Sequence, residues 1–181
     1  MKRVLMALES DFPPDIRVEK EAKTLIDNGY DVTLACTTRN RKKKNENLHG
    51  ISIRRKYISA LTYKSSVGAL IFPFYFHFWT SYLNSILKRE QFDIIHIHDL
   101  PLAKIGYNLS LKYNLRFVLD LHENYPYLLK EARHINTPLG RLFFSLPQWL
   151  NYEKQMLQKA DVIISVIEEQ KQRFTSIGGD E

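Results

Sequence analysis

The sequence is poor in the residues that build redox centres and phosphate-binding loops. Among 181 residues there is one cysteine, Cys36, which cannot form an internal disulfide, and there are 7 glycines. No GxGxxG follows the first apolar segment, and the prolines at Pro13 and Pro14 donate no amide hydrogen there, so NAD or FAD binding is disfavoured. No HExxH, CxxC or GxSxG occurs, so neither a dedicated metal site nor a serine hydrolase is expected, and no cofactor is implied.

Long hydrophobic runs are also missing. The apolar run after Met1 is far shorter than the core of a signal peptide. The aromatic segment Val67–Leu87 is interrupted by Pro73, His77 and Asn84, so it does not fit a membrane span of about 20 apolar residues. Together with the unpaired cysteine, these features predict a cytoplasmic protein.

The totals fit a folded domain with a basic surface. Hydrophobic residues make up 44% of the chain and charged residues 25%, so residues 1–181 are expected to form a single domain. The net charge of +6 favours an anionic partner, which is nucleic acid, an acidic membrane or a phosphorylated small molecule. The basic segment Arg39–Asn47, which includes Arg41, is expected to be a solvated loop or a phosphate or lipid contact.

The order of apolar segments predicts alternating strands and helices. Lys2–Leu8 and Asp31–Cys36 are short apolar or β-branched runs typical of strands. Between them lies a helical stripe that Gly29 would end, with apolar positions at Val18, Ala22, Leu25 and Ile26. This strand, helix and strand form a βαβ unit, which is the building block of parallel sheets.

The same order recurs further along the chain. Strands are expected at Ile51–Tyr57, Phe92–His98, Leu115–Leu121 and Ala160–Ile167, with helices at Leu102–Tyr113, Pro147–Lys159 and in a tail ending at Phe174. The pattern predicts a doubly wound, mostly parallel, Rossmann-like α/β domain.

The aromatic segment Val67–Leu87 has helical spacing on one side. The positions concerned are Phe72, Phe76, Trp79, Leu83, Ile86 and Leu87. The opposite side of the expected helix carries Phe74, Phe78 and Tyr82, with two basic residues following the segment. That side is either a second buried face or a surface that lies on an anionic bilayer.

Polar side chains gather where two of the expected strands end. His98 and Asp99 end one strand, and Asp120, His122 and Glu123 end the next. Side chains alternate along a strand, so Asp120 and His122 share a face, as do His98 and His96. Ligands of open parallel sheets bind at the carboxyl ends of the strands, so these groups are expected to meet in one crevice.

Each of these polar residues also has a structural interpretation. His96 lies inside its strand and is expected to be a hydrogen-bonded core histidine, and the same alternative stays open for His98. Asp99 and Asp120 either cap the following turn or orient a histidine. His122, followed by Glu123 at the strand end, is the strongest candidate for a functional group.

The first loop offers two further candidates. Asp15 is placed to cap the helix that follows it. Arg17, in the first turn, either faces the crevice with a charge suited to phosphate or pairs with Glu21 one turn later.

Four segments in this order resemble the N-terminal half of family 4 glycosyltransferases, the retaining GT-B enzymes. The segments are PPDIRVEKEAKTLIDNGYDVTLAC, FDIIHIHDLPLA, FVLDLHENYP and EKQMLQKADVIISV. The resemblance implies an acceptor-binding domain of a two-domain enzyme. Its donor-binding partner domain, with an E-x7-E motif, is expected after residue 181. Many members carry a glycine pair in the first loop, where this sequence has PPDIR.

The resemblance also implies roles for single residues. His122 would lie beside the reacting sugar as the catalytic residue, and the loop Phe12–Arg17 would lie near the donor phosphates. Our own hypothesis adds that Glu123 and Asp99 contact acceptor hydroxyls and that Arg17 meets phosphate. The remaining substrate-binding candidates are Asp15, His98 and Asp120.

The implied activity is metal-independent sugar transfer. The donor is a nucleotide-sugar and the acceptor a glycan or polyprenyl-linked molecule, in cell-surface polysaccharide synthesis at the inner face of the plasma membrane. The alternative is a non-catalytic membrane-docking or scaffold subunit that recruits a catalytic chain. Nucleic-acid binding is not expected, because the basic residues are not interleaved with stacking aromatics.

Overall fold

A computed structural model describes residues 1–40, 42–66, 68–132, 135, 144–166 and 168–177. Within these residues one sheet of seven strands runs in the order β3-β4-β2-β1-β5-β6-β7. The strands are β1 Arg3–Leu8, β2 Asp31–Thr38, β3 Asn45–Leu48, β4 Ile51–Tyr57, β5 Ile94–His98, β6 Arg116–Leu121 and β7 Val162–Ser165. All neighbouring pairs are parallel except β3 with β4. The predicted doubly wound, mostly parallel α/β fold is confirmed.

The strand order reverses between β1 and β5. From β1 the chain builds outward through β2 and β4, and it then crosses to β5 and builds outward on the other side. Ligands of doubly wound sheets bind at the carboxyl side of such a switch point. Strand β5 lies at the switch point, and β6 is the next strand outward. These two strands carry His98 and Asp120 near their carboxyl ends.

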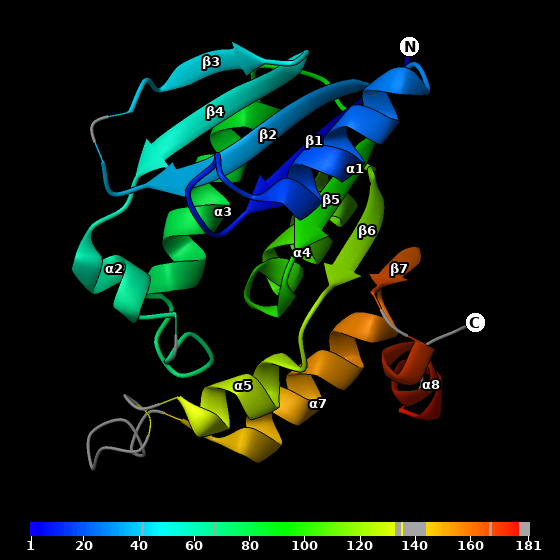
Figure 1. Ribbon diagram of the computed structural model, residues 1–181. Coiled ribbons are helices and arrows are strands. Elements are labelled where there is room, and N and C mark those ends of the chain that lie inside the picture. Colours follow the sequence, from blue (N-terminus) through cyan, green and yellow to red (C-terminus); the bar gives the residue numbers. More distant parts are fainter. Residues whose placement is uncertain (41, 67, 133–134, 136–143, 167, 178–181) are drawn as a thin grey trace.

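Helices cover both faces of the sheet (Figure 1). They are α1 Ile16–Asp27, α2 Ala60–Lys64, α3 Phe74–Leu87, α4 Ala103–Tyr113, α5 Tyr125–Glu131, α7 Leu146–Leu157 and α8 Glu168–Ser176, with the short 3-10 helix η1 Leu100–Leu102. Helix α1 lies on one face, whereas α3 and α4 lie on the other (Figure 1).

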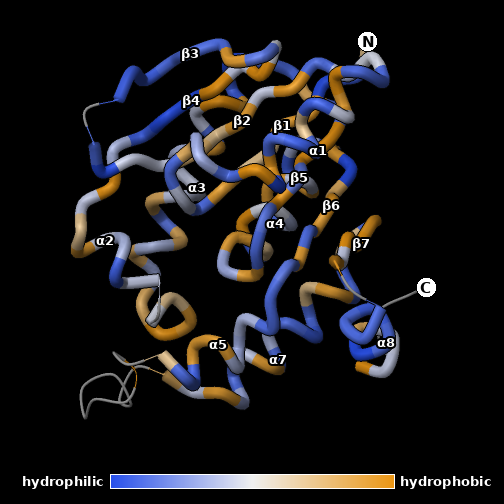
Figure 2. The backbone as a smooth tube through the Cα atoms, in the orientation of Figure 1, coloured by the Kyte–Doolittle hydropathy of each residue, from blue (hydrophilic) through white to orange (hydrophobic). Residues whose placement is uncertain are grey.

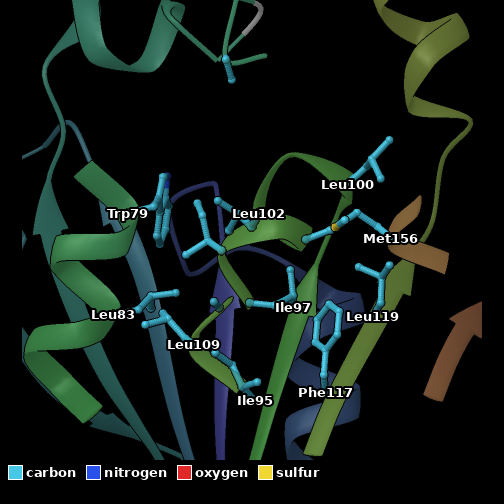
Figure 3. Packing of buried hydrophobic residues seen from close by; sticks show 14 of the residues in the cluster. Trp79, Leu83, Ile95, Ile97, Leu100, Leu102, Leu109, Phe117, Leu119 and Met156 are labelled. Atoms are coloured by element: carbon cyan, nitrogen blue, oxygen red, sulfur yellow. The ribbon is translucent and has the colours of Figure 1, made fainter. Parts of the chain in front are cut away.

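Strand alternation divides the core into two clusters. On the α3 side, Ile95 and Ile97 of β5 and Leu119 of β6 are fully buried against the helices. Figure 3 shows Trp79 and Leu83 facing these strand residues. On the α1 side, a smaller cluster joins Val18 and Ala22 to apolar residues of β1, β2 and β4.

Two sequence expectations need correction. The helix predicted over Val67–Leu87 begins only at Phe74, after Pro73, because a proline disfavours helical backbone at the residue before it. The segment Arg39–Asn47 was expected to be a loop, yet its end belongs to the antiparallel edge strand β3. The predicted positions Arg41, Val67 and Ile167 lie outside the described residues.

The two edge strands differ, since β3 is hydrophilic and β7 is apolar. Figure 2 shows β3 and α8 in hydrophilic colours. None of the helices described in the structure is both long enough and apolar enough to span a membrane.

Candidate functional site

The centre of the candidate site is the buried carboxylate of Asp120. The register of β5 and β6 places His98 directly beside Asp120, and His98 Nδ1 lies 3.1 Å from Asp120 Oδ2. His122, just beyond β6, brings its Nε2 atom to 2.8 Å from the same oxygen. The rings of His98 and His122 are nearly parallel, with centroids 6.1 Å apart. The sequence prediction that His98, Asp120 and His122 meet at the strand ends therefore holds.

Two further groups approach this carboxylate from either side. His96 Nε2 and Asp120 Oδ2 are 3.8 Å apart, and Glu21 of α1 lies 3.8 Å from the same His96 atom. Glu21 Oε2 is also 3.9 Å from His98 Nδ1. Helix α1 thus adds a carboxyl group to the cluster. From the sequence, Glu21 was expected only as a possible ion-pair partner of Arg17. Its position one turn after Arg17 does put both side chains on one helix face.

Many polar atoms of this cluster have no hydrogen-bond partner of good geometry within the described residues. They are Glu21 Oε2, His96 Nε2, both ring nitrogens of His98 and of His122, and both carboxylate oxygens of Asp120. Short contacts such as that of His122 with Asp120 are therefore electrostatic rather than well-aligned hydrogen bonds. His96 is buried as predicted, but its expected hydrogen bond is missing at Nε2. Unsatisfied buried groups are rare, so this concentration makes the cluster the candidate functional site.

The environment separates the pKa values within the cluster. Burial alone would raise the pKa of Asp120, but interactions with His122 and His98 outweigh it and hold that pKa below its usual range. Burial, together with the charge of Asp120, raises the pKa of Glu21 to about 8. Burial and the neighbouring His98 lower the pKa of His96 to about 3. At neutral pH Asp120 is therefore ionised, whereas Glu21 is protonated and His96 is neutral.

The first loop places Arg17 at the edge of the cluster. Asp15 caps α1, since its side chain accepts a hydrogen bond of 3.1 Å from the Val18 amide. Arg17 lies 3.5 Å from Asp15 and 3.9 Å from Asp99. Its ion pairs therefore run to these aspartates rather than to Glu21, the partner considered from the sequence. Arg17 faces the crevice, and its Nε atom lacks a partner in the part of the chain that the structure describes.

Asp99 is held by its backbone rather than by capping. Its φ of 71° lies in the left-handed region, which a residue other than glycine rarely adopts. Its amide donates a hydrogen bond of 2.9 Å to the carbonyl of Asp120. Its side chain forms no cap to η1, so the capping alternative for Asp99 is wrong. Burial raises the pKa of Asp99, although Arg17 opposes this rise.

Glu123 stays outside the cluster. It is exposed beyond the end of β6, and the ion pairs of the cluster within the described chain do not include it. Sequence reasoning missed Glu9, at the end of β1, because its position resembles an ordinary surface loop. Burial raises the pKa of Glu9 to about 7, and Asp99 adds to this rise.

One buried and one exposed hydrogen bond hold the first loop in place. Arg55 of β4 is 4% exposed, and its Nε atom donates a hydrogen bond of 3.0 Å to the carbonyl of Phe12. Lys42 donates one of 2.9 Å to the carbonyl of Pro13. The loop that leads to Arg17 therefore has a defined position without the glycine pair expected of the resemblance.

A groove of about 590 Å³ lies on the α1 side of the sheet. Arg17, Glu21 and His96 stand along it together with aliphatic residues of α1 and the strands. The groove therefore reaches the cluster at Glu21 and His96.

Most of the chain matches the model of a known protein family. The family model named Glycosyltransferase Family 4 matches residues 16–181. The chain belongs to this family. Membership supports a role in sugar transfer, and it confirms the resemblance seen in the sequence. No curated protein matches the chain.

Solved GT-B glycosyltransferases have the same fold. Sucrose-phosphate synthase from Thermosynechococcus elongatus superposes with a TM-score of 0.70 at 13% identity, over 97% of this chain and 45% of the other. An α,α-trehalose-phosphate synthase from Burkholderia vietnamiensis gives 0.60 at 12% identity, over 97% and 42%. Arabidopsis thaliana UGT89C1 complexed with UDP gives 0.58 at 11% identity, over 96% and 47%. The chain thus spans less than half the length of these three proteins.

Proposed function

We propose that this chain is the acceptor-side domain of a retaining glycosyltransferase that moves a sugar from a nucleotide-sugar to a glycan or polyprenyl-linked acceptor. The observation that carries the proposal is the Asp120 cluster at the carboxyl ends of β5 and β6, next to the switch point of the sheet. Family membership and the UDP complex of a structural relative support a nucleotide-sugar donor.

His122 is the group proposed to act on the reacting sugar. Asp120 is ionised and holds His122 Nε2 at 2.8 Å, which orients the ring. The other nitrogen, Nδ1, is buried and has no partner in the described part of the chain, and it is the atom proposed to hydrogen-bond a hydroxyl of the reacting sugar. His98 supports the same carboxylate, so its proposed role is to position His122 through Asp120.

Arg17 is the group proposed to meet phosphate. A guanidinium binds phosphate oxygens in a fixed fork geometry. Asp15 and Asp99 hold the Arg17 side chain at the crevice, and Asp99 is in turn joined to β6 through its amide. Asp99 and Glu123 are proposed to bind acceptor hydroxyls, with Glu123 reaching the acceptor from its exposed position.

We propose that the transfer step uses no metal ion. The donor side of the cleft is proposed to come from a second domain. In a GT-B enzyme the nucleotide-sugar is bound between two domains, and correct placement of both substrates lowers much of the barrier. We expect residues 1–181 alone to show negligible turnover, because one wall of the cleft is then missing.

The experiment is a transfer assay with the full-length protein that the gene encodes. It uses a panel of radiolabelled UDP-, GDP- and dTDP-sugars, and lipid and glycan extracts of the source cells as acceptors. Incorporation of label from one donor, with the anomeric configuration retained in the NMR spectrum of the product, supports the proposal. Absence of incorporation from every donor, or inverted product, contradicts it.

A second candidate, a membrane-docking subunit, rests on a surface that keeps only Phe74 of the aromatics predicted to face a bilayer. Of the three aromatics expected to face a bilayer, Tyr82 is buried and donates a hydrogen bond of 2.7 Å to the Arg54 carbonyl. Phe78 is covered by Lys56, whose Nζ lies 4.7 Å from the ring centre. The exposed large apolar residues near the start of α3 are instead Leu61, Ile71, Phe72 and Phe74.

Liposome flotation distinguishes this candidate. The docking proposal predicts co-flotation with vesicles containing anionic phosphatidylglycerol, and loss of flotation in Leu61→Ser with Phe74→Ser. If the double variant floats as wild type does, the apolar surface near α3 is not the docking site.

A further inference from the structure

Four of the unsatisfied groups in the cluster are arranged as metal ligands. Glu21, His96, His98 and Asp120 each offer one ligand atom, and these atoms all lie within 4.8 Å of one another. They come from α1, β5 and β6, so no sequence motif with short spacing announces them.

The distances are close to those of a tetrahedral zinc site. Two ligands of such an ion lie about 3.4 Å apart, given metal–ligand distances of about 2.1 Å. The measured separations are 3.1 Å for His98 with Asp120 and 3.8 Å for His96 with Asp120. Glu21 lies 3.8 Å from His96 and 3.9 Å from His98. These four separations lie on either side of the tetrahedral value, and all of the ligand atoms lie within 4.8 Å of one another, so the side chains would have to draw together to complete the coordination.

The burial of these groups supports an ion rather than solvent. The side chains of His98 and Asp120 are 0% exposed, and that of His96 is 5% exposed. The four ligand atoms of Glu21, His96, His98 and Asp120 have no hydrogen-bond partner among the described residues. A divalent cation would satisfy all four at once; it would displace the proton of Glu21 and then balance the charges of two carboxylates.

The geometry points to a binding site for one divalent transition-metal ion, zinc by ligand type, formed by Glu21, His96, His98 and Asp120. Two imidazoles and two carboxylates are ligands that zinc accepts, whereas magnesium and calcium prefer oxygen alone. The groove beside Glu21 and His96 is the entry path.

Such an ion would support the residues proposed to act on the substrate and would not itself contact the substrate. Four protein ligands leave no open coordination position for a substrate, as in structural zinc sites. It would hold Asp120 in place, and Asp120 in turn contacts His122 at 2.8 Å. The site therefore gives the protein a means to fix the orientation of His122. This inference concerns metal binding, and it stands whether or not the proposed sugar transfer is correct.

The test is metal binding by the full-length, tag-free protein after treatment with a chelator. Zinc is titrated in competition with a chromophoric chelator, and cobalt is titrated with detection of the visible absorption of tetrahedral Co²⁺. We expect one ion per chain and a higher melting temperature when zinc is added. Glu21→Gln, on the surface helix α1, and His96→Gln are each expected to weaken binding at least about 10-fold.

His49→Gln is the matched control. His49 pairs with Glu19 at 3.1 Å on the surface, outside the cluster, so this variant is expected to bind zinc as wild type does. Glu21→Gln keeps the result interpretable if His96→Gln does not fold. The inference is overturned if the wild-type protein binds no zinc at micromolar concentrations, or if Glu21→Gln binds it as tightly as wild type.

Discussion

The two faces of strands β5 and β6 differ in how their buried groups are satisfied. On the α3 face, Ile95, Ile97 and Leu119 are fully buried among apolar neighbours, which is what stabilises a sheet. On the α1 face, His98 and Asp120 are equally buried, but their polar atoms lack hydrogen bonds. Unsatisfied buried groups cost stability, so the α1 face is organised for binding and the α3 face for folding.

The largest expected effect comes from breaking the α3 face. Ile97→Ala removes a fully buried side chain that packs in the main cluster, and we expect it to lower the free energy of unfolding by about 2–5 kcal/mol. Urea denaturation followed by circular dichroism measures this. A loss below about 1 kcal/mol would mean that the α3 face is less tightly packed than described.

Glu9, the residue after β1, is an ionisable group whose burial affects stability. Its pKa is about 7 in the folded protein against 4.5 normally, so the folded state favours the protonated form. The stabilising contribution of Glu9 is therefore complete below about pH 4.5, falls as the pH rises from there to about 7, and is lost above that, by at most about 3 kcal/mol in all.

Glu9→Gln removes this ionisation. Glu21, whose pKa is also raised, still lowers stability over this interval in both proteins. We therefore expect the variant to lose less stability than wild type between about pH 4.5 and about pH 7, and the difference between the two proteins to level off above that. Thermal melts at a series of pH values measure both proteins. Parallel curves would show that Glu9 titrates normally.

On the α1 face of β5, an apolar substitution is not expected to lower stability, whereas Ile97→Ala on the α3 face is expected to lower it. His96→Leu removes an unsatisfied nitrogen and adds an aliphatic side chain to a groove lined by Val4, Ile94 and Val118. With chelator present, we expect stability to be unchanged or higher by about 1 kcal/mol. Urea denaturation measures the difference. A marked loss of stability would show that His96 supports the fold.

The smallest effect separates the two roles of Asp15. Asp15→Ala loses the cap of α1 and should cost about 1 kcal/mol, whereas asparagine caps equally well. Asp15→Asn is therefore expected to fold as wild type does. Its transfer activity then reports whether the charge of Asp15, beside Arg17, also serves the substrate.

The fold was predictable because its elements carry strong local patterns. Apolar runs identified β1, β5 and β6, and the stripe through Val18 and Ala22 identified α1. Strand β3 was missed because NENL is polar and pairs at the sheet edge through its backbone. The helix predicted from Val67 started too early because the aromatic spacing continued past Pro73 into a turn.

The site was predictable only in part. Alternation along β5 and β6 correctly grouped His98 with Asp120 and His122 at the strand ends. It could not reveal Glu21, which depends on how α1 rests on the sheet, nor the missing hydrogen bond of His96. Tertiary distances of this kind are not encoded in a single segment.

The most direct test of the central claim is the transfer rate of the full-length His122→Ala variant with its best donor and acceptor. His77→Ala is the control, since His77 is exposed on α3. The account predicts that His122→Ala loses at least about 100-fold in kcat with an unchanged melting temperature, whereas His77→Ala keeps full activity. If His122→Ala transfers sugar as fast as the control, the buried polar cluster has no part in sugar transfer.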